Sequence, residues 1–83
     1  MLIYISPGHN IVINNNFIKT GYIGIQYKSV VDLVISNNLV LAQSLTAINS
    51  TTAGGIDNEN VTIIGNHLDG GTASGGIIRD TLN

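Results

Sequence analysis

Residues 32–40, Asp32-Leu33-Val34-Ile35-Ser36-Asn37-Asn38-Leu39-Val40, carry the clearest signature of how this chain folds. The stretch is a short run of mostly β-branched apolar residues that ends in a pair of asparagines. Similar runs occur at 10–18 and at 60–68, so that successive runs are separated by 22 and then 28 residues. Self-similarity at such a period, with strand-like rather than helical runs, predicts a solenoid in which each repeat stacks on the next.

The apolar positions within each run keep a period of two, which is typical of strands. Alternate side chains should therefore face inward and meet only the equivalent residues of the neighbouring repeats. The asparagines that follow should form corners, because asparagine tolerates the left-handed conformation and bonds to its own backbone. We expect three short sheets per repeat, with strands near 2–6 and 24–27 and a turn at 19–21. Two buried columns are predicted: Ile3, Ile25, Ile48 and Ile77, and Ile13, Ile35 and Ile63.

Composition limits the classes of function. The chain has 83 residues, enough for one small domain, and is 43% hydrophobic but only 10% charged. A net charge of −2 leaves no basic patch for nucleic acid or an anionic membrane surface. Cysteine is absent, no apolar run is long enough to span a bilayer, and the first residues show no signal peptide. The sequence therefore predicts neither nucleic-acid binding nor membrane insertion.

The pattern Asn-Val-x-Ile-x-x-Asn-x-Leu at 60–68, followed by Gly76-Ile77, resembles the repeat of right-handed parallel β-helix proteins. That superfamily contains pectate lyases, polygalacturonases and bacteriophage tailspikes. The resemblance covers nearly the whole chain and implies an all-β, right-handed parallel β-helix of about three rungs of 22–28 residues. Residues 1–83 would form a single β-helix segment of a larger protein or assembly. The resemblance also implies an internal ladder of stacked carboxamides, formed here by Asn16, Asn38 and Asn66.

The resemblance leaves two functions open, because this fold hosts lyases, hydrolases and structural shafts. The first is a structural or receptor-binding segment of a phage tailspike or tail fibre that contacts cell-surface polysaccharide. Its location would be the virion tail or an extracellular surface. The alternative is a fragment of a polysaccharide-degrading enzyme, either a lyase or a glycoside hydrolase. Enzymes of this superfamily have many more repeats than this chain, which favours the first function but leaves catalysis undecided.

Three carboxylates, Asp57, Glu59 and Asp69, are the weak candidates for catalysis. Cleavage of a glycosidic bond requires a pair of carboxylates, one of which protonates the leaving oxygen. Either of the first two residues could pair with Asp69 from an adjacent rung. A solvated turn explains the same residues more simply. A sugar site should also present an aromatic platform, but the aromatic residues lie away from the acidic stretch in the sequence: Tyr4, Phe17, Tyr22 and Tyr27.

No residue pattern calls for a metal ion or a cofactor. The histidines and carboxylates lack metal-ligand spacing, and the glycine pairs lack the lysine and helix start of a phosphate loop.

Two outward columns are more apolar than a solvated sheet should be. One contains Val12 and Val34 and continues to Thr62. The other contains Phe17 and Leu39 and continues to His67. A contiguous apolar stripe on a small domain is typical of an association surface. The sequence therefore predicts a homo-oligomer, and the resemblance to tailspikes implies a trimer.

Overall fold

A computed structural model describes residues 3–51, 57–70 and 78–81 of the chain. Within these ranges the protein is all-β, as predicted, and no helix is long and apolar enough to cross a bilayer. In chain order the strands are β1 (Ile3–Ile5), β2 (Gly8–Asn14), β3 (Phe17–Lys28), β4 (Val30–Ser36), β5 (Leu39–Thr51), β6 (Glu59–Ile64), β7 (His67–Gly70) and β8 (Ile78–Thr81).

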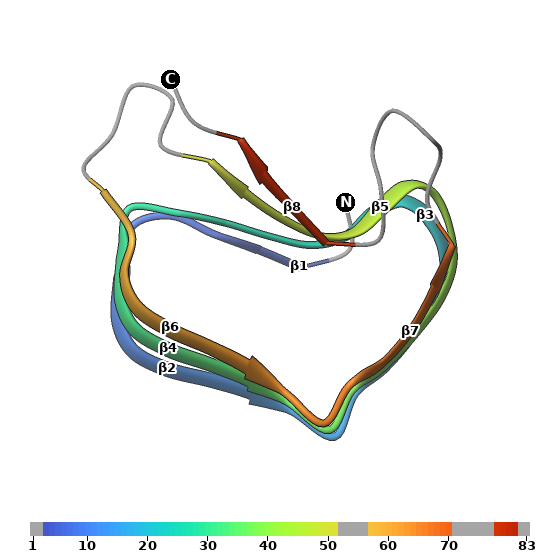
Figure 1. Cartoon of the computed structure of the whole chain (residues 1–83), viewed down its shortest axis with the longest axis horizontal. Helices are drawn as coiled ribbons and strands as arrows, with labels where there is room; N and C mark the ends of the chain where they lie inside the picture. The colour runs from blue at the N-terminus through green and yellow to red at the C-terminus, as the bar shows by residue number, and fades with distance from the viewer. Residues whose placement is uncertain (1–2, 52–56, 71–77, 82–83) are drawn as a thin grey trace.

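The strands form two parallel sheets, and the chain alternates between them from β1 to β7 (Figure 1). One sheet has the order β2-β4-β6, and the other has the order β1-β3-β5-β7 with β8 also paired to β5. Every pairing between these strands is parallel. Ile13 pairs with Ile35, which pairs with Ile63, so the predicted alignment of the repeats in this column is confirmed.

The core lies between the two sheets and is built from the inward members of the alternating runs. Leu33 and Ile35 are fully buried, whereas Val12, from the opposite face of β2, is 63% exposed. Burying an aliphatic side chain of this size contributes about 1.5–3 kcal/mol. Because no single repeat encloses a core, that contribution depends on the stacking of neighbouring repeats. The buried apolar cluster consists of Ile13, Ile18, Ile25, Tyr27, Val30, Leu33, Ile35, Val40, Ala47 and Ile48.

A two-residue corner joins each strand of the β2-β4-β6 sheet to the next strand of the other sheet. The first residue of each corner is left-handed, with φ of 57° at Asn15, 54° at Asn37 and 68° at Gly65. Asparagine and glycine are the residues that adopt this conformation most readily, which explains why they recur at this offset. The equivalent corners therefore stack as closely as the strands do.

Two details of the prediction were wrong. The described strands hydrogen-bond into two sheets rather than three, because β3 runs without interruption through the predicted turn at 19–21. Thr20, with φ of 64°, bends the strand there without ending it. In addition, Ile48 pairs with Ile78 and not with Ile77, which lies outside the described residues. The alignment of the rest of that column is as predicted, since Ile25 pairs with both Ile3 and Ile48, but Ile3 is only half-buried.

Candidate interaction surfaces

Three aligned asparagines form a hydrogen-bonded column at the corner between the sheets. The backbone N–H and the Nδ2 of Asn16 both donate to Oδ1 of Asn38, each at 3.0 Å. The backbone N–H and the Nδ2 of Asn38 both donate in turn to Oδ1 of Asn66, each at 2.9 Å. All four bonds point the same way along the column, from the first repeat towards the third.

The column satisfies polar groups in an otherwise apolar interior. Asn38 is only 2% exposed, and its Nδ2 also donates to the carbonyl oxygen of Ile13 at 3.0 Å. Nδ2 of Asn66 donates in the same way to the carbonyl oxygen of Ile35 at 2.9 Å. An unpaired buried amide would cost about 1–3 kcal/mol, so these bonds hold the corner together. These hydrogen bonds have a structural role, because they pair the amide groups with one another and with backbone carbonyl oxygens.

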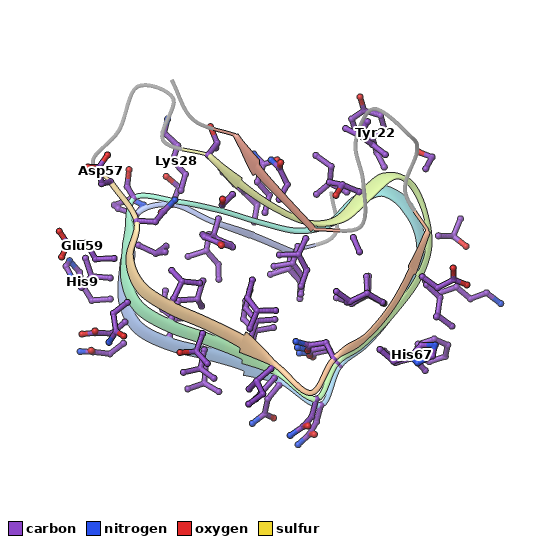
Figure 2. The ribbon with its side chains drawn as sticks, viewed as in Figure 1. His9, Tyr22, Lys28, Asp57, Glu59 and His67 are labelled. Atoms are coloured by element: carbon purple, nitrogen blue, oxygen red, sulfur yellow. The ribbon has the colours of Figure 1, made fainter. Side chains whose placement is uncertain are left out.

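The candidate catalytic carboxylates are not brought together. Asp57 and Glu59 are exposed at the start of β6, whereas Asp69 is exposed on β7. These two places lie on opposite sides of the molecule, which measures 29 by 26 Å in the plane of view (Figures 1 and 2). A glycosidase pair needs its carboxyl groups about 5–9.5 Å apart. Asp69 therefore cannot act with either of the other two on one bond within one protomer.

The acidic stretch has a structural explanation. Oδ1 of Asn58 accepts a bond from the backbone N–H of Val30 at 3.0 Å, and its Nδ2 donates to the carbonyl oxygen of Thr51 at 3.3 Å. The asparagine between the two carboxylates thus ties the start of β6 to the preceding repeat. Asp57 and Glu59 flank this attachment and point outward (Figure 2).

Sequence reasoning missed a second set of polar residues that stack. Asn10, Asp32 and Asn60 all have left-handed backbones, with φ of 54°, 62° and 53°. Nδ2 of Asn60 donates to Oδ1 of Asp32 at 2.6 Å. The signal was present in the sequence, because an asparagine or aspartate stands at the same offset before each apolar run.

The outward columns lie on the two sides of the asparagine corner. In the Phe17 column, Phe17 pairs with Leu39, which pairs with His67. Phe17 is 67% exposed, Leu39 is half-buried and His67 is exposed. In the Val12 column, Val12 pairs with Val34, and Val34 pairs in turn with Thr62. Val34 is half-buried and Thr62 exposed, so apolar surface reaches solvent over two adjacent strands in each column.

The exposed ring of Tyr22 is separated from the acidic stretch. Tyr22 is 59% exposed and lies at the opposite end of the molecule from Asp57 and Glu59 (Figure 2). Tyr27, the aromatic residue that follows it on β3, is buried. The acidic stretch and Tyr22 thus do not combine into a sugar site with both a carboxylate and an aromatic platform.

The two histidines are also far apart. His9 and His67 lie on opposite sides of the molecule (Figure 2). Across residues 3–51, 57–70 and 78–81, no group of three His, Cys, Asp or Glu side chains could hold a metal ion. Comparisons with protein-family models, with curated proteins and with solved structures find no match to this chain.

Proposed function

We propose that this chain is a segment of a right-handed parallel β-helix with a structural or receptor-binding role of the tailspike or tail-fibre kind. Parallel pairing of equivalent residues in successive repeats supports the fold, because each sheet grows by one strand per repeat. The hydrogen-bonded asparagine column supports it independently. Stacked carboxamides of this kind stabilise repeats that lie in register.

The observation that carries the proposed role is the Phe17 column. Its members form a continuous outward stripe over three neighbouring strands, with a largely exposed phenylalanine at one end and a half-buried leucine in the middle. Stacked apolar side chains on the outer face of a sheet are typical of a protein contact surface. In the proposal this stripe, together with the Val12 column, packs between protomers of a homotrimer.

The polysaccharide contact is a further part of the proposal. An exposed ring such as that of Tyr22 offers an apolar face and a polar tip, which suits binding at a wet interface. Such a segment would act on a virion tail or another extracellular surface. Catalysis is not part of the proposal, since Asp57 and Glu59 lie away from both Asp69 and Tyr22.

Lateral association can be tested by sedimentation of two variants of β5. Leu39→Glu places a charge in the middle of the Phe17 column and should dissociate the trimer. Ser44→Glu places the same charge at an exposed position of the same strand and should leave the trimer intact. A wild-type protein that sediments as a monomer at micromolar concentration, or a Leu39→Glu variant that stays trimeric, would contradict the proposal.

A further inference from the structure

Among the described residues, no strand covers either end of the β2-β4-β6 stack, and the two ends are made of different residues. β2 and β6 are the outer strands of their sheet, and each has one neighbour. We call these the β2 end, which includes the first part of β3, and the β6 end, which includes β7. In the described part of the chain, the partly buried apolar residues that pack against the core all lie on the outer strands β1, β2, β6 and β7: Ile3, Ile5, Ile11, Val61, Ile63 and Leu68.

The asparagine column is polar, so its two ends are complementary. At the β6 end, the backbone N–H of Asn66 has no bonding partner among the described residues, and its Nδ2 has one partner, the carbonyl oxygen of Ile35. At the β2 end, Oδ1 of Asn16 accepts no bond from the described residues. The same two donors and the same acceptor meet at both existing steps of the column. The β6 end therefore presents two donors of Asn66, and the β2 end presents the matching acceptor, Oδ1 of Asn16.

The backbone of the corners adds hydrogen bonds between repeats that run in the opposite direction to those of the asparagine column. The N–H of Leu39 donates to the carbonyl oxygen of Asn16 at 2.8 Å, and the N–H of His67 donates to that of Asn38 at 2.9 Å. The next step in the series would join the N–H of Phe17, at the β2 end, to the carbonyl oxygen of Asn66, at the β6 end. Open backbone groups on outer strands are a template for strand addition.

Charges on the two ends are also complementary. The β6 end carries Glu59, which shares a column with His9 of the β2 end. It also carries Asp69, which follows Leu68 on β7. Leu68 shares a column with Ile18, and Ile18 is followed by Lys19. The register of β7 on β5 shifts between Val40 and Gln43, so Asp69 lies within one position of the Lys19 column. If the strand series continued by one more step, His9 would lie beside Glu59, and Lys19 would lie near Asp69 on the neighbouring strand.

We propose that the β6 end of one protomer docks onto the β2 end of a second protomer, which continues both the sheet pairing and the asparagine column. Asn66 then donates to Oδ1 of the partner's Asn16, and Asp69 lies near the partner's Lys19. Val61 and Ile63 pack against the partner's Ile11 and Ile13. This contact is head-to-tail, so it can repeat along the stack axis. It is separate from the lateral contact through the Phe17 column.

Strand β8 occupies an edge of β5 that continuous stacking would also use. β8 pairs with β5 and places Ile78 beside Ile48. In a continuous stack, β1 of the partner would pair with the same edge of β5. The partner's Ile3 would then take the place of Ile78, because Ile3 pairs with Ile25 and Ile25 pairs with Ile48. Either strand puts an isoleucine there. One of the two must leave that edge of β5 when protomers stack.

A charge-exchange experiment on the full chain tests the proposal. Lys19→Glu and Asp69→Lys each place like charges across the head-to-tail contact, which opposes docking. Sedimentation velocity should show concentration-dependent species larger than the lateral oligomer for the wild type, and each single variant should require about tenfold more protein to form them. In an equimolar mixture, each variant can dock onto the other. In both of these mixed contacts, residues 19 and 69 then carry opposite charges again. The larger species should return in that mixture.

The lateral trimer provides the control. Single charge-exchange variants should remain trimers with an unchanged circular dichroism spectrum, whereas Leu39→Glu disrupts the lateral contact only. Hydrogen exchange gives a second readout, since stacking should slow exchange at 59–70 and at 8–19. The proposal is overturned if the wild type never exceeds the lateral oligomer, as it would if flanking repeats of a longer chain covered these ends. It is also overturned if the mixture fails to regain the larger species.

Discussion

The side chain of Asn38 donates to Oδ1 of Asn66 at 2.9 Å, and the backbone N–H of Asn38 donates to the same oxygen at the same distance. A single acceptor thus fixes both the side chain and the main chain of the preceding corner. Oδ1 of Asn38 does the same for Asn16. Because Asn38 has a partner on both sides and is almost fully buried, it is the most constrained residue of the column.

Asn38→Ala should therefore lower the free energy of unfolding by about 1–3 kcal/mol, because buried amides on both sides would lose their partners. Urea denaturation of the variant and the wild type measures this difference. Asn14→Ala, at an exposed position of β2, is the matched control and should change stability by less than about 0.5 kcal/mol. Equal effects at the two positions would mean that the column contributes nothing specific.

Gly65 should tolerate asparagine better than a β-branched residue. It has φ of 68°, and a Cβ atom added there would lie 2.7 Å from Oδ1 of Asn37. Gly65→Val should cost about 1–3 kcal/mol, because valine is strained in the left-handed region. Gly65→Asn should cost less, since the equivalent residues of the other corners are Asn15 and Asn37. Thermal melting of the two variants compares them, and a lower melting temperature for Gly65→Asn would contradict this explanation of the corner.

The pairing of β2, β4 and β6 could be predicted from the sequence because each run keeps strict alternation. A slip of one residue would turn every inward side chain outward, so Ile13, Ile35 and Ile63 have only one register that buries them all. The path of β3 could not be predicted in the same way. Thr20 adopts a left-handed backbone within a continuous strand, and threonine gives no local signal for that conformation.

The candidate site was less predictable than the fold. The alignment placed Asn16, Asn38 and Asn66 at equivalent positions, but the direction of their bonds depends on side-chain rotation and cannot be derived from spacing. For the carboxylates, closeness in the sequence did not predict closeness in space. Glu59 and Asp69 are ten positions apart in the sequence, yet the corner between β6 and β7 sends them to opposite sides of the molecule.

Ile35→Ala should be among the most destabilising substitutions in the chain. Ile35 is completely buried and pairs with an isoleucine on each side, so its truncation leaves a cavity that neighbouring repeats cannot close. The expected loss is about 2–5 kcal/mol in the free energy of unfolding. Val12→Ala removes apolar atoms from a position that is 63% exposed and should cost far less in the same urea titration. A small effect of Ile35→Ala would show that the core is looser than the structure indicates.

The last prediction concerns catalysis. Because Asp69 lies across the molecule from Asp57 and Glu59, a single protomer should not cut the surface polysaccharide that we propose it binds. Incubation with bacterial surface polysaccharides should release no new reducing ends and no unsaturated products, while Tyr22→Ala weakens binding. Glu59→Gln should leave binding unchanged, since Glu59 lies at the opposite end of the molecule from Tyr22 (Figure 2). Cleavage that disappears in Glu59→Gln or Asp69→Asn would contradict the prediction. It would then favour a groove shared between chains, in which the second carboxylate comes from a partner.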